Sequence, residues 1–205
     1  MTLHLDRHRS GLVGATVLLL LVGAVGGYAW SARSGESEAG SAVTVRAVAH
    51  RASATDHNGA DVDFARSMTP HHSQAIEMAR LARTRAGSTQ VRTLAARIEA
   101  AQAPEIEQMA GWLRTWGEGD GRRGGSMDGM MSRSDMTSLA AERGAAFDND
   151  FVTMMMAHHA GAIAMAHDEL VDGRSAAALA LATAVQVTQQ AELGQMRTML
   201  RAMSG

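Results

Sequence analysis

Apolar residues recur every three or four positions along a long stretch of the chain, which is the spacing of one face of an α-helix. The pattern breaks at Ala86-Gly87-Ser88, where a Gly suited to ending one helix precedes a Ser suited to starting the next. This stretch therefore predicts a helix–turn–helix hairpin. Its apolar positions include Phe64, Met68, Ala75, Met78 and Ala82 before the break, and Leu94, Ile98, Ile106, Met109 and Leu113 after it.

The second half of the chain repeats the first. A shift of 87 positions places His71-His72 on His158-His159, and the same shift matches other polar and apolar positions without a gap. One constant offset over about fifty residues indicates an internal duplication. The second copy breaks at Asp172-Gly173-Arg174-Ser175. Two hairpins that bury their apolar faces against each other predict an all-α four-helix bundle. Further matched pairs are Met68 with Met155, Gln102 with Gln189, Glu105 with Glu192, and Met109 with Met196.

The chain divides into three parts. Residues 1–30 carry a basic flank and then an apolar run of roughly 20 residues, which predicts a signal peptide or an N-terminal membrane anchor. Residues 31–60 are rich in Ser, Ala and Gly and predict a flexible linker. The bundle follows over 61–205, with repeats at about 61–116 and 138–203. Between them, the Gly- and Met-rich connector 117–137 is too polar and too interrupted to be helical. We therefore expect an extracytoplasmic domain that is secreted, periplasmic or anchored to the outer face of the cytoplasmic membrane.

Composition narrows the chemistry. The chain has no Cys, 15 Met and 9 His, and its formal net charge is -2. Disulfide frameworks, thiolate zinc sites and cysteine nucleophiles are therefore excluded. The charge balance gives no basic footprint for nucleic acid, so contact with a membrane is expected only through the N-terminal segment.

The adjacent histidines of each copy are the candidate functional residues. In a hairpin that turns near Gly87, His72 lies opposite Gln102, and Met68 lies one position from facing Glu105. The second copy places its own histidine, glutamine, methionine and glutamate in the same way. We predict that both pairs lie at similar depth in the interior or in a cleft, with a glutamate in reach of each. The residues of this predicted site are His71, His72, His158, His159, Met68, Met155, Glu105 and Glu192.

Two interpretations of this site remain open. Histidine, glutamine and glutamate at one level can satisfy one another by hydrogen bonds as a polar core. Alternatively, imidazole and thioether ligands without thiolate favour copper, above all Cu(I). The connector residues Met127, Met130 and Met131, with Met136, could collect soft ions, or could belong to a low-complexity loop that makes adaptable apolar contacts.

Pro70 stands inside the first predicted helix, where the second copy has Ala157. Proline has no amide hydrogen to bond the carbonyl of Arg66. We therefore expect the helix to kink or to restart near Thr69 as a new N-cap, and the equivalent helix to run straight through Ala157.

The two copies resemble the ferritin-like domain of unknown function 305 family over about residues 61–203. The resemblance rests on Phe64, Met68, Pro70-His71-His72, Ala75-Ile76 and Met78-Ala79, on their second copy, and on the Gln102, Glu105, Met109 pattern. It implies an exported four-helix bundle, some members of which bind copper in the periplasm through Met and His. It does not imply an enzymatic activity.

These observations lead to a functional expectation. The first hypothesis is a non-enzymatic extracytoplasmic copper-binding protein for buffering, resistance or delivery, with a metal ion as ligand, a copper-handling protein as candidate partner and no organic cofactor. The second is a structural or partner-binding bundle with a polar core and no metal. A metalloenzyme is the least supported, because the motif helices lack the Glu-x-x-His of di-iron bundles and no acid–base pair is recognisable.

Overall fold

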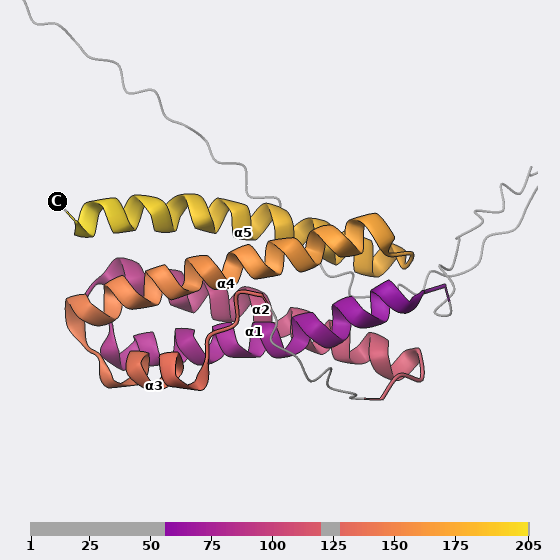
Figure 1. The fold of residues 1–205 in the computed structure, drawn as a ribbon, viewed down its shortest axis with the longest axis horizontal. Helices are drawn as coiled ribbons and strands as arrows, with labels where there is room; N and C mark the ends of the chain where they lie inside the picture. Colours follow the sequence, from indigo (N-terminus) through magenta and orange to yellow (C-terminus); the bar gives the residue numbers. More distant parts are fainter. Residues whose placement is uncertain (1–55, 120–127, 205) are drawn as a thin grey trace, which may run out of the picture. The chain divides into compact units, whose positions relative to one another are not determined.

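The computed structural model describes residues 56–119 and 128–204. Within these ranges the chain forms α-helices and no β-strand, which confirms the predicted all-α fold (Figure 1). Helices α1 and α2 form one antiparallel hairpin, α4 and α5 form the other, and α1 packs against α4. None of the described helices combines the length and the apolar character needed to cross a membrane. The helices are α1 (Gly59–Arg85), α2 (Thr89–Thr115), α3 (Arg133–Ala141), α4 (Gly144–Asp172) and α5 (Ala176–Met203).

Some predictions fall outside the described residues. These are the signal peptide or anchor at 1–30, almost all of the linker at 31–60, and Met127 in the connector. They stay predictions.

The two hairpin turns occur where the sequence places them. The Ser88 hydroxyl oxygen accepts the Val91 amide at 3.2 Å and caps α2, and Ser175 caps α5 in the same way. Gly173 is the C-cap of α4, so it ends that helix as predicted. Gly173 has a φ of -70°, so it is not left-handed. A Cβ on Gly173 would lie 2.4 Å from the carbonyl oxygen of Glu169, and one on Gly87 would lie 2.9 Å from the Gly144 backbone. Gly87 thus allows a close approach to the backbone at Gly144, and Gly173 allows the chain to pass close to Glu169 in the last turn of α4.

Each hairpin caps the turn of the other. The Asp61 carboxylate on α1 accepts the amides of Arg174 and Ser175 at 3.0 and 2.8 Å. The Asp148 carboxylate on α4 accepts the amides of Gly87 and Ser88 at 3.0 and 2.7 Å. Asp61 and Asp148 are equivalent in the two repeats, so the bundle has a two-fold pseudosymmetry that includes these contacts. Neither aspartate was predicted from the sequence to cap a turn.

Glu169 is a buried carboxyl group beside the Asp61 cap. Burial raises the pKa of Glu169 to about 8, and the neighbouring Asp61 carboxylate adds to this shift. Burial also acts to raise the pKa of Asp61, but the hydrogen bonds from Asn58 and the turn amides, together with the nearby Glu169, outweigh it, and the pKa is lowered. At neutral pH Glu169 is therefore neutral and Asp61 is anionic, and neither side-chain oxygen of Glu169 has a partner in hydrogen-bond geometry.

The core is divided by the two histidine pairs. Along α1, residues 62–68 belong to one apolar cluster and residues 75–82 to another. Along α4 the order is reversed, because α4 runs antiparallel to α1. The pairs His71-His72 and His158-His159 lie between the clusters, and we call these four residues the histidine layer.

Two local predictions were wrong. The connector is not irregular up to residue 137, because α3 begins at Arg133. The Ser132 hydroxyl oxygen accepts the Asp135 amide at 3.1 Å, and the Asp135 carboxylate accepts the Ser132 amide at 2.9 Å. This reciprocal capping box offsets the poor composition of the segment.

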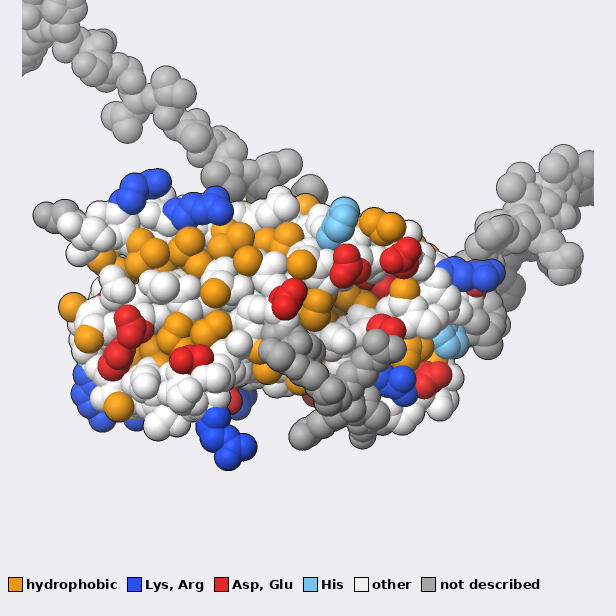
Figure 2. All heavy atoms as spheres, in the orientation of Figure 1, with side chains coloured by type: hydrophobic (Ala, Val, Ile, Leu, Met, Phe, Trp, Pro, Cys, Tyr) orange, Lys and Arg blue, Asp and Glu red, His pale blue; other side chains and the backbone are white. Residues whose placement is uncertain are grey.

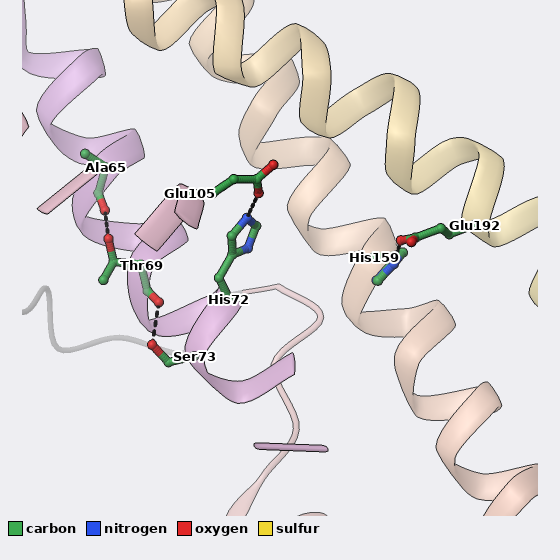
Figure 3. Close-up of polar contacts among 7 residues, drawn as sticks. All are labelled: Ala65, Thr69, His72, Ser73, Glu105, His159 and Glu192. Atoms are coloured by element: carbon green, nitrogen blue, oxygen red, sulfur yellow. Dashed lines mark hydrogen bonds and ion pairs between the residues drawn. The ribbon is translucent and has the colours of Figure 1, made fainter. Parts of the chain in front are cut away.

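Helix α1 does not restart at Thr69, since it continues from Gly59 to Arg85 through Pro70. The alternative, a kink at Pro70, stays a prediction. Instead, the Thr69 hydroxyl donates to the carbonyl of Ala65 at 2.7 Å and the Ser73 hydroxyl donates to the carbonyl of Thr69 at 2.8 Å (Figure 3). Buried residues on both sides of Pro70 hold the helix in place, so tertiary packing overrides the cost of the proline. Helix α4 continues through Ala157, as predicted.

Candidate metal centre

All four imidazoles of the histidine layer are buried, with 0% exposed surface. The histidine atoms visible on the surface in Figure 2 therefore belong to other residues. His71 and His72 come from α1, and His158 and His159 come from α4, so the contact between these two helices brings the pairs together. Their interior position is the one that the hairpin geometry predicted.

Each hairpin contributes one histidine–glutamate pair. Nε2 of His72 lies 2.6 Å from Oε2 of Glu105 on α2. Nε2 of His159 lies 2.7 Å from Oε2 of Glu192 on α5, which is the equivalent contact in the second repeat (Figure 3). The side chains of Glu105 and Glu192 are 21% and 12% exposed. The glutamates thus connect buried imidazoles to the protein surface.

The other two imidazoles face each other. The rings of His71 and His158 have centroids 3.7 Å apart and planes inclined by 41°. Neither nitrogen of either ring has a partner in hydrogen-bond geometry, and Nδ1 of His72 and of His159 also has none. Six buried ring nitrogens of the layer are therefore without a hydrogen bond, although buried polar atoms in proteins are nearly always paired.

These central imidazoles are neutral. Burial lowers the pKa of His71 to about 3, and the neighbouring His72 adds to the shift, while the nearby Asp128 backbone acts weakly in the opposite direction. Burial likewise lowers the pKa of His158 to about 2, with further contributions from His71 and His159. A neutral imidazole has the free lone pair that metal binding requires.

A narrow cleft between α2 and α5 reaches the glutamates. It encloses about 10 Å³, which is about the space that one water molecule or ion needs. Gln102 and Gln189 face it, and each has a buried side-chain oxygen without a hydrogen-bond partner. The lining consists of four pairs of equivalent residues: Ile98 and Val185, Ala101 and Thr188, Gln102 and Gln189, and Glu105 and Glu192.

The predicted sulfur ligands are buried beside the layer. Met68 belongs to one apolar cluster and Met155 to the other, so the two lie on opposite sides of the histidines. Within residues 56–119 and 128–204, no three His, Asp or Glu side chains are placed to hold one metal ion. Other buried side chains beside the layer with donor atoms for a metal are Met68, Met155, Gln102 and Gln189. A donor set of imidazole and thioether is suited to a soft ion.

The connector methionines that the structure describes are half-buried, and Met136 packs against the apolar cluster that contains Met155. Met131 is half-buried, and its side chain packs against the apolar cluster that contains Met155. The Met131 carbonyl accepts a hydrogen bond from the Gln74 side chain on α1, and the Met131 amide donates one to the same side chain. Met130 is also half-buried. The packing of Met131 gives it a structural role that the sequence had offered as an alternative.

Comparison with known proteins identifies the family. The family model described as "Domain of unknown function (DUF305)" matches residues 61–200. The chain belongs to the DUF305 family. Curated proteins give no match.

Solved DUF305 structures share the fold. One is described as a "putative secreted protein DUF305" from Streptomyces coelicolor, with 30% identity and a TM-score of 0.67 over 71% of this chain and 94% of that one. A DUF305 fragment from Deinococcus radiodurans has 28% identity and a TM-score of 0.67 over 72% and 99% of the two chains. CopM in its Cu(I)-bound form has 29% identity and a TM-score of 0.63 over 71% and 98%. CopM has also been solved with Cu(II) and with Ag bound.

Proposed function

We propose that this DUF305 protein is an extracytoplasmic, non-enzymatic metal-binding protein that carries copper, with Cu(I) favoured, for buffering, resistance or delivery. The observation that carries the proposal is the set of six buried ring nitrogens in the histidine layer that have no hydrogen-bond partner. A purely polar core would be expected to pair these atoms with one another or with the glutamines. The copper- and silver-bound forms of CopM add support.

The histidine–glutamate contacts supply a choice of ligand atom. A carboxylate only accepts hydrogen bonds, so Nε2 of His72 carries the hydrogen that is donated to Glu105, and the same holds for His159 and Glu192. Nδ1 of each ring then has the free lone pair. Carboxylates hold metal-binding histidines in this way in many sites, fixing the tautomer and the ring orientation. Glu105 and Glu192 are thus proposed as positioning residues.

The ligand assignment follows from burial and chemistry. His71, His72, His158 and His159 would supply nitrogen, and Met68 and Met155 would supply thioether sulfur, which has no proton to lose. A copper-handling protein is the proposed partner in delivery. The proposed location outside the cytoplasm is supported by the N-terminal apolar segment and by the described secretion of the Streptomyces relative.

An anaerobic Cu(I) titration of the full chain against a chromogenic chelator tests the proposal. Joint replacement of the four layer histidines by Ala is expected to abolish tight binding and to leave weak capture by the Met127 to Met136 segment. Replacement of the methionines of that segment by Leu, which keeps its backbone contacts with α1 and α4, is expected to do the reverse. His167→Ala, which removes an exposed imidazole on α4, is the matched control and keeps the affinity of the parent.

A milder variant covers the case in which the four-alanine chain does not fold. Glu105→Gln combined with Glu192→Gln keeps the side-chain volume, and it is expected to weaken Cu(I) binding by roughly 10–100-fold. Full Cu(I) affinity and stoichiometry in a folded four-alanine chain would reject the histidine layer as the copper site. Absence of metal binding by the parent chain would favour the structural or partner-binding bundle.

A further inference from the structure

A short segment after the connector crosses the bundle at the histidine layer. We call residues 128–131 the strap. Nε2 of Gln74 on α1 donates to the Met131 carbonyl at 2.9 Å, and Oε1 of Gln74 accepts the Met131 amide at 2.7 Å. One side chain thereby satisfies both backbone groups of Met131, as a neighbouring β-strand would. This pair of bonds attaches one end of the strap to α1.

The other end of the strap lies directly on α4. A Cβ on Gly161 would lie 2.0 Å from the Asp128 carbonyl oxygen and 3.0 Å from Cα of Gly129. Gly129 has a φ of +79°, and a Cβ on it would lie 2.6 Å from the carbonyl oxygen of Ala157. Any side chain at Gly161 would therefore push the strap away from the helix, because the atoms that it meets are backbone.

These two attachment points are equivalent positions in the duplicated sequence. The offset of 87 places Gln74 on Gly161, while the next two residues, Ala75 and Ile76, match their counterparts. The repeats thus differ at the position that contacts the strap. Gln74 contacts it through side-chain hydrogen bonds, and Gly161 contacts it through the backbone. Each position also lies three residues after His71 or His158, on the same helix face as that histidine.

The strap consequently lies beside the central imidazole pair, over the faces of α1 and α4 that carry Gln74 and Gly161. The Asp128 backbone is near enough to His71 to oppose the lowering of its pKa, which burial dominates. Glu105 and Glu192, which contact the other two histidines, line the cleft between α2 and α5. The layer thus has the strap beside its central imidazole pair and carboxylates at its other two imidazoles.

We propose that the strap controls the exchange of metal at His71 and His158, so that an ion reaches or leaves this pair when residues 128–131 lift from α1 and α4. The inference rests on the proposed function of the layer as a metal site. Gln74 and Gly161 then act as positioning residues that keep the strap closed. Neither residue is a proposed ligand.

Variants at the two attachment points test the strap through kinetics. Gln74→Ala removes both bonds to Met131, and Gly161→Ala places a methyl group against Asp128. In each, the transfer of Cu(I) from the loaded full chain to excess chelator is expected to be on the order of tenfold faster, as for the loss of one or two hydrogen bonds, with unchanged stoichiometry. The controls are Gln90→Ala, an exposed glutamine on α2, and Gly194→Ala, where a Cβ meets nothing within 4 Å.

A metal-free measurement separates this inference from the proposed function. Hydrogen exchange of the Met131 amide and diethyl pyrocarbonate labelling of His71 and His158 are expected to be faster in both variants than in the controls. If the parent binds no copper, the proposed function fails, while the labelling still reports whether the strap covers the imidazoles. Unchanged labelling and transfer rates in a variant whose Met131 amide exchanges freely would overturn the strap as a gate. Unchanged exchange in both variants would overturn the assigned attachments.

Discussion

The imidazoles of His71 and His158 couple folding to pH. Their pKa values are lowered to about 3 and about 2 from an ordinary value of 6.5. The unfolded chain therefore binds more protons than the folded chain as pH falls below 6.5. In the metal-free protein, these two imidazoles therefore leave the free energy of unfolding at its full value above that pH. As pH falls below it, the free energy of unfolding declines progressively toward about pH 3. The expected loss at about pH 5 is about 2 kcal/mol for each imidazole.

Urea unfolding at about pH 7 and about pH 5 measures this loss. The double variant His71→Leu, His158→Leu has no imidazole to protonate at these positions, and its stability is expected to change much less between the two pH values. His167→Leu provides the control, because that histidine is exposed and keeps the acid sensitivity of the parent. Equal pH dependence in the double variant and the parent would contradict the assignment of the acid sensitivity to these two rings.

Helix α1 tolerates a local defect in its hydrogen bonding. Pro70 leaves the Arg66 carbonyl without its usual amide partner, although the helix is continuous. Pro70→Ala restores the residue type of the second repeat and is expected to raise the free energy of unfolding by about 1–3 kcal/mol. The reciprocal change Ala157→Pro in α4 is expected to lower it by about 3 kcal/mol. Thermal and urea unfolding of both variants compare the two helices; a destabilised Pro70→Ala would mean that the native packing requires the proline.

The sequence was sufficient for the helices whose signals are local. Apolar spacing located the hairpins, and Ser88 and Ser175 marked the starts of their second helices. Ser132 and Asp135 carried an equally local signal for α3, but the polar composition of the connector outweighed it in the prediction. The role of Gly87 was not predictable, because the backbone that it approaches, at Gly144, comes from a distant part of the sequence.

The candidate site was predictable to a similar extent. The constant offset and the hairpin geometry brought the four histidines and both glutamates together. The tilted ring contact of His71 with His158 depends on how α1 packs on α4, which no local sequence pattern encodes. In the sequence, Gln74 and Gly161 are only two different residues at equivalent positions of the repeats. Their role became apparent only once the path of the strap was known.

For the molecule as a whole, the reciprocal aspartate caps join the two hairpins. Asp148→Ala removes two hydrogen bonds to the first turn, and Asp61→Ala removes two to the second turn as well as its own capping box. Each change is expected to cost about 1–3 kcal/mol, with the larger loss for Asp61. Urea unfolding measures the loss, and Asp168→Ala, at an exposed position on α4, is the control. Losses no larger than that of the control would show that these caps do not hold the hairpins together.

The same caps impose an order on the folding of the chain during its synthesis. Asp148 is made 60 residues after Ser88, and Arg174 follows Asp61 by 113 residues. Because a chain leaves the ribosome from its N-terminus at about 5–20 residues per second, the first hairpin emerges with its turn amides facing water and waits seconds for its cap. The second hairpin finds its cap already synthesised. Both pairs of caps can thus form only when nearly the whole chain has been synthesised. A nascent chain halted after α2 lacks the Asp148 carboxylate that accepts the amides of its turn.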